Sequence, residues 1–254
     1  MPHQAAAPSP PPALSVVIPA YQEQSRLGLT LDKIIAYLKR RRTSYEIVVV
    51  DDGSTDDTAA VAAGYGGEHV RVLRQPQTGK GAAVRRGVTA SRGDWVLVSD
   101  ADLSTPIEEL ERLEAARDRA EVILGSRALA ESRIEVRQPI YRELMGKTFN
   151  LIIRSLGLSD VRDTQCGFKL IRGDVARALF ARMTIDRFAF DIELVWLARA
   201  LGHRTAEIGV VWLNSPHSTV RPITDSAAML RDALRIRMRP RPRPANPDGE
   251  RKKP

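Results

Sequence analysis

The chain of 254 residues has one cysteine, Cys166, and aromatic residues make up only 5% of it. A lone cysteine excludes an internal disulfide and is typical of a reducing compartment. No run approaches the ~18 consecutive apolar residues that a membrane span needs. The first residues have neither the basic nor the apolar segment of a signal peptide. We therefore expect a cytoplasmic globular protein.

The sequence also lacks the glycine patterns of two common nucleotide-binding loops. No GxGxxG follows the first apolar run, which argues against a dinucleotide-binding enzyme. The segment "TGKGAAVRRG" (residues 78–87) is rich in glycine but does not have GxxxxGK[ST] spacing. Its backbone N–H groups and Lys80 could bind a phosphate. The alternative is a solvated lysine between two turn glycines.

Negative charge is in the minority, because the formal net charge is +8. Nucleic acid, anionic lipid and phosphorylated small molecules are all partners that suit a basic protein. Nucleic acid is not favoured, because no aromatic residues interleave the basic ones and no binding motif is present.

Short apolar runs alternate with helical patterns over the first half of the chain. We expect strands at 14–20, 45–50, 69–75, 94–100 and 120–126, and helices at 27–38, 54–66, 79–93 and 104–118. Continuous apolar runs of this length are typical of parallel strands buried on both faces. The order predicts an α/β fold with a mostly parallel sheet and helices on both faces. Ligands bind such sheets at the carboxyl ends of the strands.

The expected domain organisation is one catalytic domain over residues 14–222, with flanking segments of other character. Five prolines within residues 1–13 predict a disordered arm. Residues 223–239 place Leu230, Leu234 and Met238 on one helical face beside Arg231 and Arg235, which predicts an amphipathic basic helix. We expect residues 240–254 to be a disordered basic tail. Alternatively, the helix packs on the domain and its charges are merely solvated.

Acidic residues follow the second and the fourth expected strands directly. Asp52 lies in "DDGS", and Asp100 and Asp102 lie in "SDADL". Both groups should project from the same sheet edge into one crevice, where repulsion raises their pKa values unless a cation or hydrogen-bond donors offset it. Mg²⁺ or Mn²⁺ held by Asp100, Asp102 and substrate phosphates fits this chemistry. The alternative is that each acid caps the following helix.

Four segments together resemble the family-2 inverting glycosyltransferases of the GT-A fold: "VVIPAYQE", "VVVDDGSTDDT", "GKGAAVRRG" and "SDADLSTP". Three later segments, "LGSRAL", "DTQCGFKL" and "FAFDIELVWLA", closely resemble the dolichyl-phosphate β-glucosyltransferases and their bacterial polyprenyl-phosphate relatives. The resemblance covers nearly everything from Leu14 to about Met238. It implies a Rossmann-like GT-A sheet in a single catalytic domain.

The resemblance also implies roles for individual residues. Asp100 and Asp102 would bind the metal that offsets charge on the departing nucleotide. The phosphate-bearing substrates would meet Arg127, whose guanidinium suits oxyanions. The remaining substrate-binding candidates are Pro19, Tyr21, Glu23 and Asp52 at the nucleoside, Lys80 and Ala101 nearby, and Asp163 and Gln165 at the sugar or the acceptor phosphate.

The sequence leaves more than one role open for three acidic residues and for the cysteine. Asp163 is either a catalytic base, an orienting group, or a turn acid paired with Arg162. Asp191 and Glu193 lie two residues apart on an expected helix, so at most one of them faces the cleft. The alternative is that the acid forms a salt bridge to a neighbouring arginine and does not face the cleft. Cys166 is expected to be a small packed apolar residue rather than a nucleophile.

The implied reaction moves glucose from UDP-glucose to a dolichyl or polyprenyl phosphate, with inversion. A GDP-mannose-dependent mannosyltransferase and an idle nucleotide-sugar binding module are the alternatives. Many relatives carry membrane spans, and this sequence has none. We therefore expect peripheral association with the cytoplasmic face of an anionic membrane. The candidate contacts are Arg235, Arg237, Arg239, Arg241 and Arg243.

Overall fold

The computed structural model of the protein describes residues 10–135, 140–213 and 222–242. Residues 1–9 of the expected arm and 243–254 of the expected tail, with Arg243 among them, lie outside the described residues.

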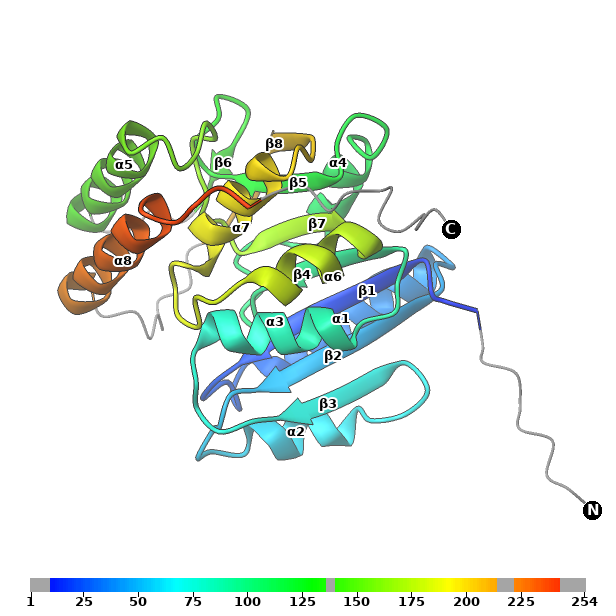
Figure 1. Cartoon of the computed structure of the whole chain (residues 1–254). Helices are drawn as coiled ribbons and strands as arrows, with labels where there is room; N and C mark the ends of the chain where they lie inside the picture. Colours follow the sequence, from blue (N-terminus) through cyan, green and yellow to red (C-terminus); the bar gives the residue numbers. More distant parts are fainter. Residues whose placement is uncertain (1–9, 136–139, 214–221, 243–254) are drawn as a thin grey trace, which may run out of the picture.

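One sheet of seven strands, in the order β3-β2-β1-β4-β7-β5-β8, forms the centre of the structure (Figure 1). Most neighbours are parallel, and only β7 is antiparallel, to both β4 and β5. The predicted mostly parallel sheet is confirmed. The strands are β1 (Leu14–Ala20), β2 (Tyr45–Asp51), β3 (Val70–Arg74), β4 (Trp95–Ser99), β5 (Val122–Ser126), β7 (Phe168–Arg172) and β8 (Thr205–Gly209), with β6 (Arg133–Ile134) and β9 (Val211–Trp212) as a separate parallel pair.

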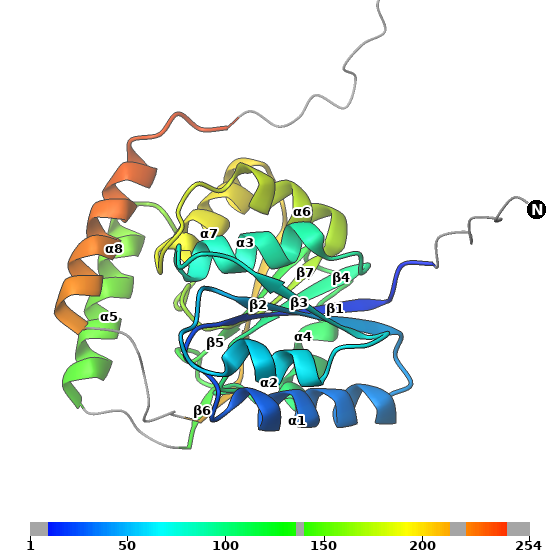
Figure 2. The same cartoon turned by 90° about the horizontal axis from the view of Figure 1, so that it is seen from below.

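Helices cover both faces of the sheet, as the alternating pattern predicts. Figure 2 shows α3, α6 and α7 on one face and α1, α2 and α4 on the other. The helices are α1 (Leu27–Arg40), α2 (Thr58–Gly64), α3 (Lys80–Ala90), α4 (Leu110–Glu114), α5 (Ile140–Ser155), α6 (Gly173–Arg182), α7 (Phe190–Ala200) and α8 (Pro222–Arg237), with a 3₁₀ turn at Ile107–Glu109.

The central strand β1 shows why these runs are continuously apolar. Its side chains alternate between two cores: Val17 packs in the cluster with α3, α6 and α7, whereas Val16 and Ile18 pack with α1. All seven residues of β1 are buried. A strand covered on both faces has no position for a solvated side chain, so the alternation of polar and apolar residues disappears.

Three of the expected helices are shorter than the sequence suggests, and α3 ends at Ala90 rather than at residue 93. Helix α2 begins at Thr58 rather than at residue 54, and Asp57 at its N-cap makes no side-chain capping bond. Ser54 accepts a hydrogen bond from the Gln22 backbone N–H (3.0 Å). Asp56 accepts one from the N–H of residue 24 (3.3 Å) and another from the Thr58 N–H at the start of α2 (3.0 Å). This polar segment therefore braces the loop that follows β1. The expected helix at 104–118 reduces to the 3₁₀ turn and α4.

Helices α5 and α8 lie side by side beyond the sheet edge at which β1 and β2 end (Figures 1 and 2). One face of α8 is buried through Met229, Ala233 and Ile236. No helix within the described ranges combines the length and the apolar character needed to cross a bilayer.

Two helical glycines give a matched test of the packing between α3 and the sheet. A Cβ at Gly87 would collide with the side chain of Val17 and lie 3.0 Å from Val50 Cγ2, whereas a Cβ at Gly64 would meet nothing within 4 Å. We expect Gly87→Ala to lower the free energy of unfolding by about 1–3 kcal/mol because the core has no room for the methyl group. Gly64→Ala should raise it by up to ~1 kcal/mol through helix propensity. Urea denaturation of both variants measures the difference, and equal effects would contradict the packing described.

Candidate functional site

Three loops meet at the sheet edge where β1, β2 and β4 end. Ala20 pairs in register with Asp51, so the segments that follow β1 and β2 leave the sheet at the same level. The pairing of β1 with β4 ends at Val17, two residues before Pro19, where a residue without an N–H is harmless. The candidate residues after β1, β2 and β4 are thereby brought to one edge, as the sequence predicts.

Asp52 is 5% exposed and holds the loop that leads into α3. Its Oδ1 accepts hydrogen bonds from Gln75 Nε2 (2.7 Å) and the Thr78 backbone N–H (2.9 Å), and its Oδ2 accepts from the Gly79 N–H (2.8 Å). The carboxylate therefore fixes the position of Lys80, the first residue of α3. Asp52 links the end of β2 to the glycine-rich segment rather than capping α2.

Asp100 lies between the glycine-rich segment and the "DTQCGFKL" segment. Its Oδ1 is 2.6 Å from Lys80 Nζ. The rest of its carboxylate lies against Gly167, where any Cβ would overlap both oxygens. Residue 167 must therefore be glycine for the Asp100 side chain to keep this position. Lys80 is consequently an ion-pair partner within the site and not a solvated lysine.

Asp102 and Ala101 complete the loop after β4. Asp102 Oδ1 accepts a hydrogen bond from the Ser104 N–H (3.0 Å), and its Oδ2 lies 3.8 Å from Arg26 Nη1. Ala101 is 4% exposed, and its carbonyl accepts a hydrogen bond from the Thr30 hydroxyl (2.7 Å). The backbone between the two aspartates is thus anchored to α1.

The residues after β1 lie beside this acidic loop. Glu23 pairs with Arg26 through both carboxylate oxygens, at 2.7 Å each. Burial raises the pKa of Glu23 above its ordinary value; Arg26 opposes the rise, and the charges of Asp102 and Asp100 add to it. Tyr21 is half-buried. Glu23 therefore belongs to the same charge cluster as Asp100 and Asp102.

Arg127, which is partly exposed, pairs with the buried carboxylate of Asp163 beside the acidic loop. Asp163 accepts hydrogen bonds from Arg127 Nε (2.7 Å), Nη2 (3.0 Å) and the backbone N–H (3.0 Å). Burial alone would raise the pKa of Asp163, but the charge and hydrogen bonds of Arg127 hold it below its ordinary value. The Arg127 guanidinium also lies 5.5 Å from the ring centre of Trp212. Arg127, and not Arg162, is the partner of Asp163.

Gln165 extends the same segment towards the C-terminal helix. Its backbone N–H donates to Asp163 Oδ1 (3.1 Å), and its side-chain Nε2 lies 3.8 Å from Met229 Sδ on α8. Cys166 is buried, and burial raises the pKa of its thiol, as expected for a packed apolar residue.

Asp191 and Glu193 at the start of α7 point to different neighbours, as their spacing predicts. Asp191 Oδ1 lies 2.6 Å from Nζ of Lys169, which is 1% exposed. Glu193 accepts hydrogen bonds from the backbone of Thr184 (3.0 Å) and Ile185 (2.8 Å), and pairs with Arg239 beyond the end of α8. Arg239 is therefore turned towards the protein, which corrects its expected role as a membrane contact. Sequence reasoning did not single out Lys169, whose only signal is a charge inside the apolar run "FKLI".

The donor set at this edge suits a hard divalent cation. Asp100 and Asp102 supply carboxylate oxygens, and no group of three or more His, Cys, Asp or Glu residues that could hold a metal occurs in the part of the chain that the structure describes. Mg²⁺ and Mn²⁺ are commonly bound by one or two carboxylates, with substrate phosphates and water as the other ligands. The residues present therefore fit such an ion when phosphates accompany it.

Known proteins share both the sequence and the architecture of this chain. The dolichyl-phosphate beta-glucosyltransferase of Dictyostelium discoideum is 36% identical over 240 residues, covering 88% of this chain and 73% of the relative. The Homo sapiens protein of the same name is 36% identical over 247 residues, covering 91% and 76%.

A solved structure supports the GT-A fold. It is the glucosyl-3-phosphoglycerate synthase of Mycobacterium tuberculosis in complex with Mn²⁺, UDP and glucosyl-3-phosphoglycerate, with a TM-score of 0.65 and 22% identity over 89% of this chain and 78% of that one. The family model described as "Glycosyl transferase family 2" matches residues 15–180. From this match and the two relatives, the chain belongs to glycosyl transferase family 2 and is a glycosyltransferase.

Proposed function

We propose that the protein transfers glucose from UDP-glucose to the phosphate of a dolichyl or polyprenyl phosphate, with inversion at the anomeric carbon. One observation carries the proposal: Asp100 of the "DAD" segment is seated on Gly167 of the "DTQCGFKL" segment. The segment typical of nucleotide-sugar transferases and the segment that resembles the polyprenyl-phosphate enzymes thus share one site. The names of the two relatives that cover most of this chain support the same acceptor.

The nucleoside would lie over the loops that follow β1 and β2. Pro19, Tyr21, Glu23 and Asp52 are the candidates, with Tyr21 stacking on the base. Because Asp52 already accepts three hydrogen bonds from the 75–79 loop, its contribution includes holding that loop and Lys80 in place. UDP in the complex of the mycobacterial synthase supports a uridine nucleotide.

The metal candidates are Asp100 and Asp102, and the ion would supply positive charge to the diphosphate as it departs. Lys80 adds a further positive charge at the same edge. Ala101, fixed by Thr30, keeps the two carboxylates on one loop. The bond that breaks joins the anomeric carbon to the β-phosphate oxygen, which leaves with the electron pair.

The acceptor phosphate would be bound by Arg127, with Asp163 and Gln165 beside it. A phosphate oxygen is largely ionised near neutral pH, so attack on the anomeric carbon needs no strong base. Asp163 is already committed to three N–H groups of Arg127. We therefore assign Asp163 to orienting Arg127 rather than to removing a proton.

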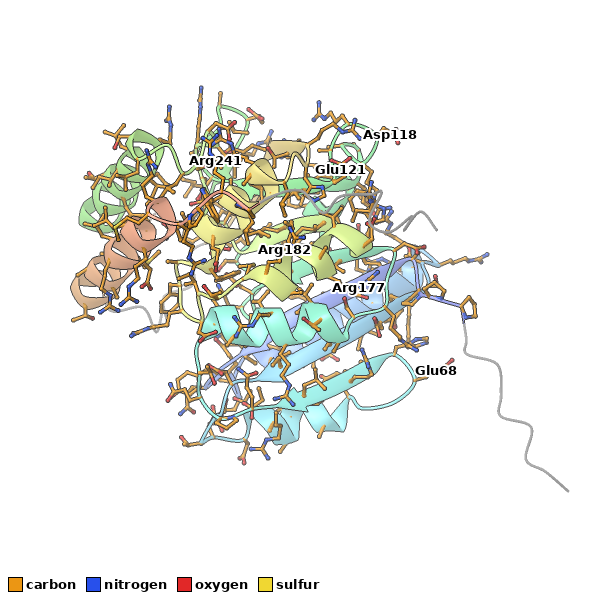
Figure 3. The ribbon with its side chains drawn as sticks, in the orientation of Figure 1. Glu68, Asp118, Glu121, Arg177, Arg182 and Arg241 are labelled. Carbon is orange, nitrogen blue, oxygen red and sulfur yellow. The ribbon has the colours of Figure 1, made fainter. Side chains whose placement is uncertain are left out.

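The membrane contact proposed for this protein is the outer face of α8 together with α5. Met238 is 76% exposed, Leu151 on α5 63% and Leu234 44%. Arg231, Arg235 and Arg237 are exposed on α8. Glu68 and Asp118, which Figure 3 labels, lie on the side of the molecule away from these two helices. This combination suits the surface of an anionic, cytoplasmic leaflet.

The donor and the acceptor are tested together with a panel of labelled nucleotide sugars and a short polyprenyl phosphate. We expect transfer from UDP-glucose only, because the "DTQCGFKL" and "FDIEL" segments resemble the glucosyltransferases. Transfer from GDP-mannose would establish the mannosyltransferase alternative instead. UDP-glucose binding in calorimetry without transfer to any acceptor would identify an idle binding module.

The metal is tested by chelation and by one substitution. We expect EDTA to abolish transfer and Mg²⁺ or Mn²⁺ to restore it, and Asp102→Ala to lower the rate by ~10²–10³-fold through the loss of electrostatic stabilisation. Asp57→Ala removes an exposed acid from the neighbouring loop and serves as the control. Full activity of Asp102→Ala, or of the EDTA-treated enzyme, would overturn the metal assignment.

Membrane binding is tested by sedimentation with vesicles of anionic or neutral lipid. Replacing Arg231, Arg235 and Arg237 by Gln should weaken binding to anionic vesicles by about 100-fold, since each arginine near such a surface contributes about 1 kcal/mol. High salt should have the same effect. A control with Arg86, Arg119 and Arg182 replaced by Gln removes equal charge from exposed positions elsewhere. If the two triple variants bind equally, α8 is not the docking surface.

A further inference from the structure

The start of α3 is clamped against the start of α7, and this clamp sets the position of Lys80. A Cβ at Gly79 (φ +127°) would lie 2.5 Å from the Asp186 carbonyl oxygen, and a Cβ at Gly81 would lie 2.7 Å from Phe190 Cβ. Both glycines therefore allow the backbone around Lys80 to touch the segment that leads into α7. Asp191 follows Phe190 directly, so Lys80 and Asp191 are held near each other.

Two lysine–aspartate pairs lie in this region, one at the surface of the site and one beneath it. Lys80 pairs with Asp100, and both side chains are partly exposed, at 26% and 32%. Lys169 pairs with Asp191 and also donates to the Cys166 carbonyl oxygen (2.5 Å). The charges of Lys80 and Asp191 also interact with each other, which links the two pairs. Burial alone lowers the pKa of Lys80, but the charges of Asp100 and Asp191 outweigh it and hold the pKa above its ordinary value.

The buried pair is not explained by stability. Removing two charges from water costs about as much as their attraction returns, and apolar residues of similar volume often serve equally well. Lys169 Nζ lies 2.6 Å from Oδ1 of Asp191. Among the described residues, this buried oxygen still receives no hydrogen bond of good geometry. Burial raises the pKa of Asp191, while Lys169 and then Lys80 oppose that rise. Asp191 thus has a buried oxygen whose hydrogen bonding is incomplete, and its charge interacts with that of Lys80.

A divalent cation bound to Asp100 would repel the Lys80 ammonium, which lies on Oδ1 of the same carboxylate. Binding of the cation therefore favours movement of Lys80 to another acceptor. Asp191, whose charge already acts on Lys80 and whose Oδ1 has no hydrogen bond of good geometry, is the acceptor that the structure offers.

We propose that Lys80 is the resident counter-ion of Asp100, that a divalent cation displaces it, and that Asp191, held by Lys169, is the positioning residue that receives it. The inference rests on the proposed metal role of Asp100. The inference adds that the metal ion and Lys80 compete for the carboxylate of Asp100. It also adds that Lys80 contacts the diphosphate of the donor from the position in which it is paired with Asp191.

The test measures binding of Mn²⁺ and of UDP separately. The Mn²⁺ titration follows the electron paramagnetic resonance signal of the free ion without nucleotide, and calorimetry follows UDP. Lys80→Met should tighten Mn²⁺ binding by about 3- to 10-fold because the competing cation is gone, and weaken UDP binding by a similar factor. Arg86→Met removes the same charge from an exposed position on α3 and should change neither. Unchanged or weaker Mn²⁺ binding by Lys80→Met would overturn the inference.

A double variant tests Asp191 without leaving a buried charge unpaired. Lys169→Met with Asp191→Asn keeps the net charge, so long-range electrostatics are unchanged. It should weaken Mn²⁺ binding by about 3- to 10-fold, because Lys80 then has only Asp100 as an acceptor. The same change made in the Lys80→Met background should have no effect on Mn²⁺ binding. An equal effect in both backgrounds would show that the pair is merely structural.

The outcome also separates this inference from the metal assignment on which it rests. If the unsubstituted protein binds no Mn²⁺ with or without UDP, the metal assignment is wrong and the inference falls with it. If Mn²⁺ binds and Asp102→Ala abolishes binding, but Lys80→Met does not strengthen it, only the counter-ion role is wrong.

Discussion

The carboxylate of Asp100 rests on the backbone of Gly167, and this contact determines how the two halves of the chain meet. Ser99 at the end of β4 pairs with Phe168 at the beginning of β7. Because β7 is antiparallel to β4, the segment before β7 arrives at the edge where β4 finishes. A parallel β7 would place "DTQCG" at the opposite end of the sheet. The residues proposed to bind the acceptor reach those proposed to bind the nucleotide only through this reversal of one strand.

The parallel half of the sheet is predictable because its strands are short, apolar throughout and separated by helical patterns. The direction of a strand cannot be predicted in the same way, because periodicity shows which faces of a strand are buried but not which way the chain runs. The start of α2 was misplaced for a different reason. Ser54 has the composition of a helix cap but bonds to the loop after β1, which is distant in sequence, and Asp56 bonds both to that loop and to the Thr58 N–H.

The sequence indicated the position of the residues that follow strands, whose roles stay predictions, and it did not single out the charged residue within β7. Asp52, Asp100 and Asp102 lie at strand ends, where parallel topology gathers polar groups. Lys169 lies inside β7, where a charged residue normally indicates a solvated face, and only its pairing with Asp191 explains its burial. The spacing of Asp191 and Glu193 indicated that they diverge. Which of the two faces the site depends on tertiary contacts that no local pattern contains.

Arg239 fixes the rotation of α8 about its own axis. Its guanidinium is bound to Glu193, which is fully buried, while Met229, Ala233 and Ile236 pack inwards. These contacts oppose rotation of the helix about its axis and hold its outward residues in one direction relative to the sheet. Glu193 in turn binds the backbone of Ile185, whose neighbouring residues touch the glycines on either side of Lys80. If a membrane docks on α8 as proposed, the buried carboxylate of Glu193 therefore helps to set the angle and the height at which that membrane lies relative to the sheet edge.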